Sequence, residues 1–537
     1  MVKIPYVRTG NVIYVDGEHG NVNNLGTSWD DAMLTVQAGI DAASDCDEVW
    51  VAALPNEGAY FKGNRTNVAV FDKGENYDRS GIALLGGFTG SVNETRRWQR
   101  DRTRTTNKTI LDGEEVNAVV RFSGITLPSR VDGFVIRNGV GDPIEENRWC
   151  GGGVVALDCS PVVSNNTISC NGTSTSGGGA YCSGGLPIFY GNNVNQNSDP
   201  QPIETGGGID VHDSWAYIAK NEIQENKAGS GGGIYSYQSA RLTIRNNVIS
   251  ENKCWDYGGG VCVDGTTAAV LDNTFELNRA GIAGGAIEAE YGSTQITGNV
   301  FKENGLPYGP NWPEEERWPD YVDRGGAIAL EWGSTHLVAN NLFVKNKAKG
   351  TGGGAIDGHQ CTASVVNNTF VENGAIERDP YEANGGAVLL RGWATSGVLV
   401  NNIFYRNVAQ GRSVGNSVAC VFFATGSVLF CGAYSEISAD DAYHYLVAEP
   451  GAGCFNHLVE TDPPEDSIFV DEGEGDYHLV LPAPEYTPVD QGHDPGGTPY
   501  HTVPSADLEG LKRPVDIDTV TNGTGGSSDM GAYEAQE

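Results

Sequence analysis

Short runs of alternating apolar and polar residues recur through the middle of the chain, and each run follows a pair or triplet of glycines. The last Gly-Gly of each copy begins at residue 152, 178, 207, 232, 259, 284, 325, 353 and 385. Most copies are therefore 25 to 29 residues long, and two are stretched. Alternate side chains of a strand point to opposite faces, so runs of period two predict strands rather than helices.

The first and third residues after each glycine group are nearly all apolar or small, so we expect these positions to face a core. The first positions are Val154, Ala180, Ile209, Ile234, Val261, Ile287, Ile328, Ile356 and Val388. Each copy also carries two asparagines five residues apart, from Asn166/Asn171 to Asn402/Asn407. Stacked asparagine amides suit the bends of a solenoid, and stacking nine units buries a face that one unit cannot bury. The pattern predicts an all-β parallel β-helix; a propeller, with blades of about 40 residues, fits less well.

The regions on either side of the repeat complete the predicted organisation. Residues 28–43 read as an amphipathic helix, capped by Thr27 or Ser28, that covers the open end of the solenoid. The run EVWVAA at 48–53 is predicted to begin the first coil. We therefore expect a cap and first coil over 1–60, β-helix repeats over 61–407, and terminal coils with an extension over 408–537.

Composition narrows the classes of function. With 34 Lys+Arg against 69 Asp+Glu, the formal net charge is −35, which argues against nucleic-acid binding because little is present to neutralise phosphates. No apolar run reaches the ~18 residues of a membrane span, and the chain opens without a signal-like stretch. The eleven cysteines are open to two interpretations: Cys150 with Cys159, and Cys254 with Cys262, pair if the protein is exported, or they are small buried residues.

The second and fourth residues after the glycines are expected to face outward, in columns that rise by about 4.8 Å per coil. In the middle coils these columns collect polar groups: Asp210, His212, Tyr235, Tyr237, Asp264, Glu288, Glu290, Glu331, Asp357, His359 and Arg391. Like charges on neighbouring strands repel, so a contiguous acidic stack indicates a bound cation, raised pKa values or catalysis. The alternative is ordinary solvated decoration of strand exteriors.

Two insertions enter just before the glycines of these polar strands, at 305–324 and 374–384, and are predicted to wall that face. Aromatic residues in and near them are candidates for stacking on sugar rings or, alternatively, for packing the loops against the solenoid. They are Tyr308, Trp312, Trp318, Tyr321, Trp332 and Trp393. With His212, Tyr235 and Tyr237, the tryptophans form the predicted substrate-binding set.

Three chemistries fit the columns. Carboxyls on adjacent or alternate coils match the spacings of retaining and inverting glycoside hydrolases, which makes Glu290 with Glu331, or Asp264 with Glu331, candidate catalytic pairs. In uronate β-elimination, Ca²⁺ held by Asp264, Glu288 and Glu290 would acidify the substrate. His359, Tyr237 or Arg391 would then handle protons or the substrate carboxylate. A divalent-metal site at Glu331, Asp357 and His359 is the third possibility.

Several phrases carry a resemblance to a known family: IYVDG…GTSWDDA…IDAA…DEVWVAA, LLGGFTG…NETRRWQRD…TILDG, the glycine/asparagine coils, and the closing DYHL…DMGAYE. They resemble bacterial secreted right-handed parallel β-helix proteins of the pectate-lyase-like superfamily, of the choice-of-anchor C-terminal type. The resemblance implies a right-handed coil, export to the exterior or the cell surface, and a polysaccharide or oligosaccharide partner.

We therefore expect a monomeric extracellular polysaccharide-active enzyme, either a glycoside hydrolase or a calcium-assisted lyase. The predicted catalytic residues are Asp264, Glu290, Glu331, His359 and Arg391. The alternative from another class is a non-catalytic adhesive β-helix that binds glycan or calcium.

Overall fold

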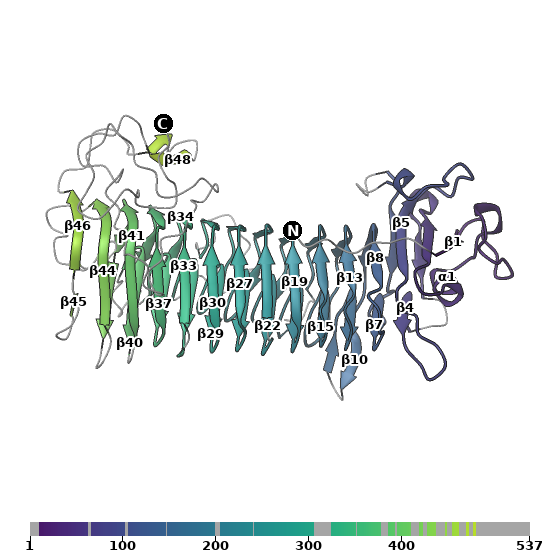
Figure 1. Ribbon diagram of the computed structural model, residues 1–537, viewed down its shortest axis with the longest axis horizontal. Helices are drawn as coiled ribbons and strands as arrows, with labels where there is room; N and C mark the ends of the chain where they lie inside the picture. The colour runs from purple at the N-terminus through teal and green to yellow at the C-terminus, as the bar shows by residue number, and fades with distance from the viewer. Residues whose placement is uncertain are drawn as a thin grey trace, which may run out of the picture. The chain divides into compact units, whose positions relative to one another are not determined.

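The computed structural model describes residues 10–62, 66–101, 106–145, 148–198, 204–239, 241–305, 324–333, 335–350, 352–376, 385–392 and 395–409, and beyond them the strands between 418 and 479. The chain divides into two compact units, residues 1–243 and 244–537. Parallel strands dominate both units, and within each unit successive coils place equivalent strands side by side (Figure 1). This confirms the predicted parallel β-helix.

In the first unit each coil contributes up to three strands to parallel sheets. The strands that follow the glycine groups, or stand in that place in the earlier coils, are β4 (Ala69–Asp72), β7 (Val120–Ser123), β12 (Val154–Leu157), β15 (Ala180–Ser183), β18 (Ile209–His212) and β22 (Ile234–Tyr237). The second row is β1 (Val12–Val15), β2 (Glu48–Ala52), β5 (Ala83–Phe88), β8 (Arg130–Asp132), β13 (Val162–Ser164), β16 (Ile188–Tyr190) and β19 (Trp215–Ala219). The third row is β3 (Ala59–Phe61), β6 (Thr109–Asp112), β9 (Phe134–Arg137), β14 (Thr167–Ser169), β17 (Asn193–Asn195) and β20 (Glu222–Gln224).

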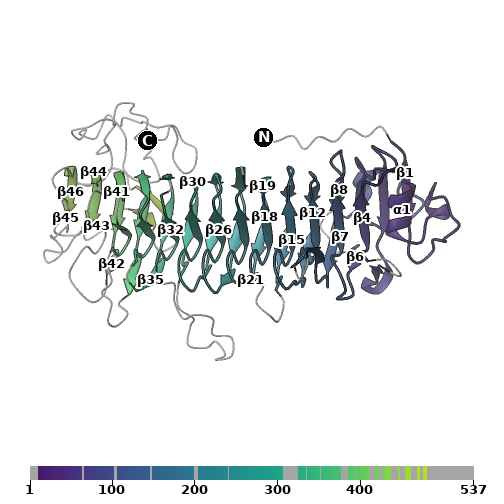
Figure 2. The same cartoon turned by 90° about the horizontal axis from the view of Figure 1, so that it is seen from below.

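The second unit repeats this arrangement (Figure 2). Its first-row strands are β26 (Val261–Asp264), β29 (Ile287–Glu290), β32 (Ile328–Glu331), β36 (Ile356–His359), β40 (Val388–Gly392), β43 (Val418–Phe422) and β45 (Leu446–Val447). The second row is β27 (Ala268–Leu271), β30 (Ser293–Thr297), β33 (Thr335–Ala339), β37 (Thr362–Val366), β41 (Ser396–Tyr405), β44 (Ser427–Glu436) and β46 (Cys454–Glu460). The third row is β24 (Val248–Ser250), β28 (Thr274–Glu276), β31 (Val300–Lys302), β34 (Leu342–Val344), β38 (Thr369–Val371) and the end of β41.

Shorter elements complete the described chain. One antiparallel hairpin, β10 (Asp142–Glu145) with β11 (Arg148–Cys150), lies in the first unit, and another, β47 (Phe469–Asp471) with β48 (Asp476–Leu479), lies in the second. The strand β23 (Arg241–Arg245) pairs with β19 and belongs to the second row. The remaining short strands are β21 (Lys227–Ala228), β25 (Lys253–Cys254), β35 (Lys347–Lys349), β39 (Gly374–Ile376) and β42 (Val408–Ala409).

Two ladders of buried asparagine amides run along each unit, as predicted. In the first unit the backbone N–H and the Nδ2 of Asn166 donate to Oδ1 of Asn192 at 3.0 and 3.2 Å, and Asn192 donates in the same way to Asn221. Nδ2 of Asn192 also donates to the carbonyl of Val163, at 2.9 Å. The ladders of the second unit each join six coils, from Asn247 to Asn402 and from Asn252 to Asn407. Because each buried amide is satisfied by its neighbours, the ladders set the register of successive coils.

The predicted inward positions form the core. Ile287, Ile328 and Ile356 are fully buried, as are the other first positions of the repeat. In the second unit, phenylalanine rings from successive coils stack with centroids 4.7–4.9 Å apart and planes within 10° of parallel; they are Phe275, Phe301, Phe343, Phe370 and Phe404. Stacked strands thus bury an apolar column that one coil could not bury alone.

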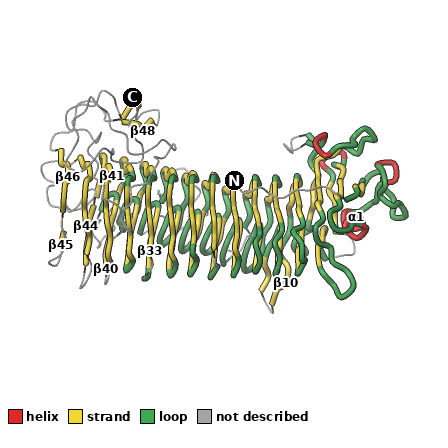
Figure 3. The backbone as a smooth tube through the Cα atoms, viewed as in Figure 1, coloured by secondary structure: helices red, strands yellow, loops and turns green. Residues whose placement is uncertain are grey.

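The capping helix is present but shorter than the predicted 28–43. Helix α1 (Val36–Ala42) follows a separate 3₁₀ turn, η1 (Trp29–Asp31), in which Ser28 caps Asp31 as predicted. Between them the backbone of Met33 is extended, because its N–H donates to the carbonyl of Tyr14 at 2.9 Å. α1 contacts β1, β2 and β4, and it buries Val36 and Ile40 against them. The helical elements of the described residues, which also include η2 (Pro55–Glu57) and η3 (Arg97–Gln99), all lie before residue 100 (Figure 3).

Two further expectations can be compared with the structure. The predicted strand at 48–53 is β2 (Glu48–Ala52), but β1 precedes it and pairs with it in parallel, so the strands begin earlier than expected. Cys150, Cys159, Cys254 and Cys262 are all buried free thiols, which corrects the disulfide alternative in favour of small buried residues. No helix among the described residues is long and apolar enough to cross a membrane.

Candidate functional site

The second unit carries the acidic column in the register that the repeat alignment predicts. The fourth residues of the first-row strands pair in the order Asp264, Glu290, Glu331, His359, Arg391 from β26 to β40. The second residues pair in the order Cys262, Glu288, Ala329, Asp357, Leu389. All five predicted catalytic residues therefore lie on neighbouring parallel strands, which rise by about 4.8 Å from one strand to the next.

The second residues of these strands were expected to face solvent, and this expectation is wrong for the second unit, where their side chains are buried. Glu288 and Asp357 are 1% and 0% exposed. The cause is the segment ahead of each strand, which folds back over this column: a Cβ on Gly258, at φ +67°, would lie 2.7 Å from the Cβ of Cys262. Only glycine allows this left-handed turn to approach so closely. The accessible face is therefore narrower than two full columns.

Three carboxyls of the second unit, those of Asp264, Glu288 and Glu290, share one acidic environment. Burial, followed by the charges of Asp264 and Glu331, raises the pKa of the half-buried Glu290 to about 7. Burial, reinforced by Glu290, raises the pKa of Glu288 well above its usual value, and the Cys262 thiol donates to Glu288 Oε2 at 3.2 Å. Burial also raises the pKa of the half-buried Asp264. Among the described carboxyls of this column, Glu290 thus combines partial exposure with a pKa near neutrality, the property required of a general acid.

Glu331 occupies a different environment, although it is next in the column. Its side chain is 4% exposed, and its Oε1 lies 2.7 Å from a guanidinium nitrogen of Arg324. Burial raises the pKa of Glu331, whereas Arg324 and a hydrogen bond from the side chain of Trp332 lower it. The accessible neighbours in the column are therefore Asp264 and Glu290, with the buried Glu331 and its partner Arg324 beside them.

The repeat alignment missed two residues of this cluster because both precede the glycines. Tyr257 and Arg324 each stand just before a glycine turn, and both form backbone bridges to Ala283. The Tyr257 phenol is close enough to Arg324, Glu331 and Glu288 for their charges to affect its pKa, which burial raises. This third column could have been found by aligning the residue before each glycine group, because it falls at a constant offset from the strand.

The far end of the column pairs an aspartate with an arginine. The Nε of Arg391 lies 3.3 Å from the carboxylate of the fully buried Asp357. Burial, followed by the charge of Arg391, lowers the pKa of His359. Nδ1 of His359 is buried and has no hydrogen-bond partner among the described residues, and its ring meets Trp332 edge-on at 5.3 Å. Burial and Arg391 thus favour the neutral form of the His359 imidazole beside the carboxyl cluster.

Two exposed aromatic residues follow the site carboxyls directly. Tyr291 comes after Glu290 and is 62% exposed, and Trp332 comes after Glu331 and is 39% exposed. Both have left-handed backbone, with φ of 52° and 54°, which is costly for bulky side chains. Trp332 was among the predicted sugar-stacking residues, whereas Tyr291 was missed. Trp312, Trp318 and Trp393, predicted for the same role, lie outside the described residues.

Metal ligands were a second prediction for this cluster. Within the described ranges, no three His, Cys, Asp or Glu side chains are arranged to hold a metal ion. Glu331 and Asp357, proposed with His359 as a divalent site, each contact an arginine instead. The calcium ligands Asp264, Glu288 and Glu290 gain no support from these positions and stay a prediction.

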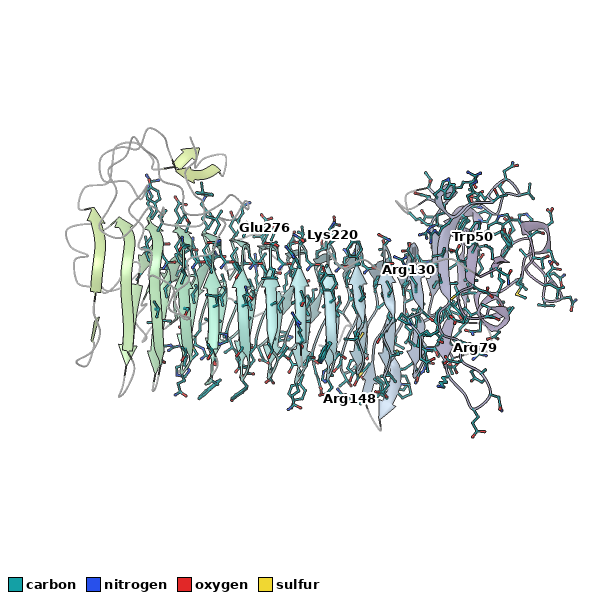
Figure 4. All side chains as sticks on the ribbon, in the orientation of Figure 1. Trp50, Arg79, Arg130, Arg148, Lys220 and Glu276 are labelled. Carbon is teal, nitrogen blue, oxygen red and sulfur yellow. The ribbon has the colours of Figure 1, made fainter. Side chains whose placement is uncertain are left out.

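The other predicted substrate-binding residues gather in the first unit. Nε2 of His212 lies 2.8 Å from Oδ1 of the fully buried Asp210, whose other oxygen accepts the Thr205 hydroxyl. The His212 ring lies 6.1 Å from Tyr235 and 5.5 Å from Tyr237. The ring of Tyr181 also lies near His212, at 5.3 Å. Its hydroxyl accepts a hydrogen bond from Arg148, a residue of β11 that is labelled in Figure 4. The first unit thus has a histidine–tyrosine cluster in place of a carboxyl column.

Solved structures resemble this chain in fold. One is pectate lyase Pel9A, at 13% identity and a TM-score of 0.35, with 99% of this chain and 98% of that chain covered. A second is a DFA-IIIase from Arthrobacter chlorophenolicus A6, at 14% identity and 0.40, covering 84% and 99%. A third is XylC in complex with xylose, at 11% identity and 0.41, covering 98% of each chain. Likeness at this level carries no argument about activity.

The family of the chain is identified from its sequence. No curated protein matches it significantly. A family model described as a right handed beta helix region matches residues 117–280 and 255–424, which together make up more than half of the chain. These residues include the glycine and asparagine coils and the first-row strands that carry both polar clusters. The chain therefore belongs to the right-handed β-helix family.

Proposed function

We propose that the protein is an extracellular polysaccharide-active enzyme that cleaves glycosidic bonds at the carboxyl cluster of its second unit. The observation that carries the proposal is the in-register neighbourhood of Asp264 and Glu290, two half-buried carboxyls with raised pKa values. Like charges one strand apart are unfavourable, and such clusters are concentrated at functional sites.

The geometry favours hydrolysis with retention of configuration. Carboxyls on adjacent strands stand about 4.8 Å apart at the backbone, close to the ~5–5.5 Å of a retaining pair. Glu290, whose pKa is about 7, would protonate the leaving oxygen, while Asp264 would attack the sugar as the nucleophile. Glu290 would then act as the base that activates water.

Neighbouring groups would adjust the pKa of Glu290 and contact the substrate. Glu331, held by Arg324 at 2.7 Å, adds negative charge that keeps the proton on Glu290. His359 and Arg391, next in the column, would meet the adjoining sugar, and the exposed rings of Tyr291 and Trp332 would stack on it. Like the histidine–tyrosine cluster of the first unit, these contacts are proposals for substrate binding.

A glycan panel assayed both for reducing ends and for absorbance at 235 nm, with and without EDTA, tests the proposal. New reducing ends without absorbance, unaffected by EDTA, are the expected result for a hydrolase. Absorbance that rises with the reducing ends and disappears with EDTA would identify a calcium-assisted lyase instead. Silence across a broad panel would contradict catalysis and favour a non-catalytic adhesive β-helix.

A further inference from the structure

A cavity of about 350 Å³ opens in the first unit, among segments that join the early strands. Its walls come from the residues after β1, after β2 and after β5, and from those before β6. The volume falls in the range of small-molecule sites, which begins at about 300 Å³. None of the residues discussed for catalysis lines it, so it is a separate feature of the molecule.

The carboxylates that line the cavity already have partners. Oδ1 of Asp16 accepts the backbone N–H groups of Glu18 and His19, at 2.9 and 3.1 Å, and its Oδ2 lies 3.2 Å from Nδ1 of His19. Oε1 of Glu57 accepts from Nζ of Lys108 at 2.8 Å. Oε2 of Glu18 lies 3.8 Å from the same His19 nitrogen. Each acid thus lies near an N–H or ammonium group, and the carboxylates with Lys108 and His19 offer both acceptors and donors, although the lining is net negative.

The rest of the lining is divided by chemistry. Leu54 and Pro55 provide an apolar wall, and Asn56, Thr89 and Asn107 provide amides and a hydroxyl. Asn56 and Glu57, both in the lining, have successive left-handed backbones, with φ of 54° and 56°. Two such residues in a row are costly, and strain of this kind is concentrated at ligand sites.

We propose that this cavity binds one neutral sugar residue, the end or a branch of a glycan chain. Each sugar hydroxyl both donates and accepts, so adjacent hydroxyls match carboxylate acceptors beside ammonium and amide donors. The C–H face of the ring would lie on Leu54 and Pro55. Three carboxylates against one lysine disfavour an anionic ligand, and a cationic ligand would compete with Lys108 for Glu57. The first unit would then hold a glycan independently of any cleavage by the second.

Calorimetry on the full chain carrying Glu290→Gln tests the proposal without turnover. The probes are methyl α-glucoside, methyl α-galactoside and methyl β-xyloside. We expect saturable binding of at least one of them, with millimolar affinity weakened about tenfold by Lys108→Met or Asn56→Gly. Glycine accepts the backbone of residue 56, so that variant removes the amide without strain. Asn246→Gly, an exposed left-handed position in the second unit, is the matched control and should leave binding unchanged.

Three results would overturn the proposal. One is the absence of saturable binding for all three glycosides. Another is unchanged affinity in both the Lys108→Met and Asn56→Gly variants. The third is tighter binding of glucuronate or glucosamine than of the neutral sugars, which would contradict the neutral assignment. Cleavage is a separate readout: an inactive protein that binds these sugars supports this site, and an active one that binds none refutes it.

Discussion

The two units build the same strand positions from the same repeat but fill them with different groups. In the first unit, the buried Asp210 contacts His212 and Thr205, and aromatic rings surround the imidazole. In the second unit, Asp264 and Glu290 are in register on adjacent strands, and burial raises the pKa of both carboxyls. The backbone is common to both units, so the difference lies in whether an acid is placed beside a basic partner or beside another acid.

We interpret this difference as one between a structural acid and the acid proposed for catalysis. The buried Asp210 carboxylate lies 2.8 Å from a histidine nitrogen and accepts one hydroxyl, so it has no second acid to repel it. Carboxyls stacked on adjacent strands are mutually repulsive, and the cost is reduced when one of them keeps its proton near neutral pH. That cost is difficult to explain by folding alone, whereas general acid catalysis uses it directly.

The largest expected effect is on turnover. Glu290→Gln removes the proton donor, and we expect cleavage to fall by about 10²–10⁴-fold. In Asp264→Ala the rate of cleavage should fall by a comparable factor. Added azide, a small anion that replaces the lost nucleophile, should restore turnover. His212→Gln in the first unit should cost less than tenfold. Initial rates on the best substrate of the panel measure all three.

Glu276→Gln is the matched control for these variants, since Glu276, labelled in Figure 4, is a partly exposed glutamate of the second unit. Its carboxylate pairs with Lys302 at 2.9 Å. Its turnover should equal that of the wild type. Full activity in both Glu290→Gln and Asp264→Ala would refute the proposed site, and a large loss in His212→Gln would move the chemistry to the first unit.

The next effect concerns the arginine beside Glu331. Arg324→Met leaves a carboxylate of 4% exposure without its guanidinium, and we expect the free energy of unfolding at pH 8 to fall by about 3 kcal/mol. Adding Glu331→Gln should recover most of the loss, because the unpaired charge is then absent. Chemical denaturation of both single variants and the double variant measures the coupling.

An exposed pair provides the control for that cycle. Arg245 and Asp272 are 48% and 40% exposed at their side chains, so Arg245→Met should cost about 0.5 kcal/mol or less. If Arg324→Met lowers the free energy of unfolding by as little as this, solvent screens the carboxyl cluster. The acids of the second unit would then not differ in environment from exposed ones.

The residues of this cluster show how much of the fold and of the site can be predicted from the sequence. The glycine and asparagine offsets recur in every copy, so they were enough to align Asp264, Glu290 and Glu331 on adjacent strands and to predict the ladders and the core. Those offsets carry no information about what covers a column. The burial of Glu288 and the reach of Arg324 depend on the turn ahead of each strand, whose path over the sheet follows from tertiary packing rather than from period.

A smaller effect should appear in the pH dependence of stability. The pKa of Glu290 is about 7 in the folded chain against 4.5 for an ordinary glutamate, so the folded state keeps a proton that the unfolded state releases. The contribution of Glu290 to the free energy of unfolding is therefore fully present below pH 4.5 and is lost as the pH rises from 4.5 to 7. After allowance for solvent screening of this half-exposed group, the decline is about 1 kcal/mol.

Glu290→Gln should flatten this decline, which makes the variant more stable than the wild type at pH 8 and equal to it at pH 4. Denaturation midpoints at several pH values check the crossover. If the wild type and Glu290→Gln differ by the same amount at every pH, Glu290 does not titrate in the acidic column. Glu276→Gln again serves as the partly exposed control.

The smallest expected effect is on KM at Tyr291, where one variant can separate substrate binding from folding. Glycine adopts the left-handed turn at this position more readily than tyrosine, so Tyr291→Gly should keep or increase stability. Loss of an exposed ring beside Glu290 should raise KM by about two- to fivefold, with a smaller change in kcat. Steady-state kinetics and a thermal melt on the same preparations measure both.

Gln360 gives a matched control because it holds the same turn position after His359, with φ of 53°, but carries no ring. Gln360→Gly removes a side chain and adds backbone freedom in the same way, so any change in KM common to both variants reflects the turn rather than the sugar contact. A rise confined to Tyr291→Gly would place a sugar on the aromatic ring beside the acid. Equal values in the two variants would leave Tyr291 as an ordinary exposed residue and limit substrate contacts at this end of the column to the carboxyls.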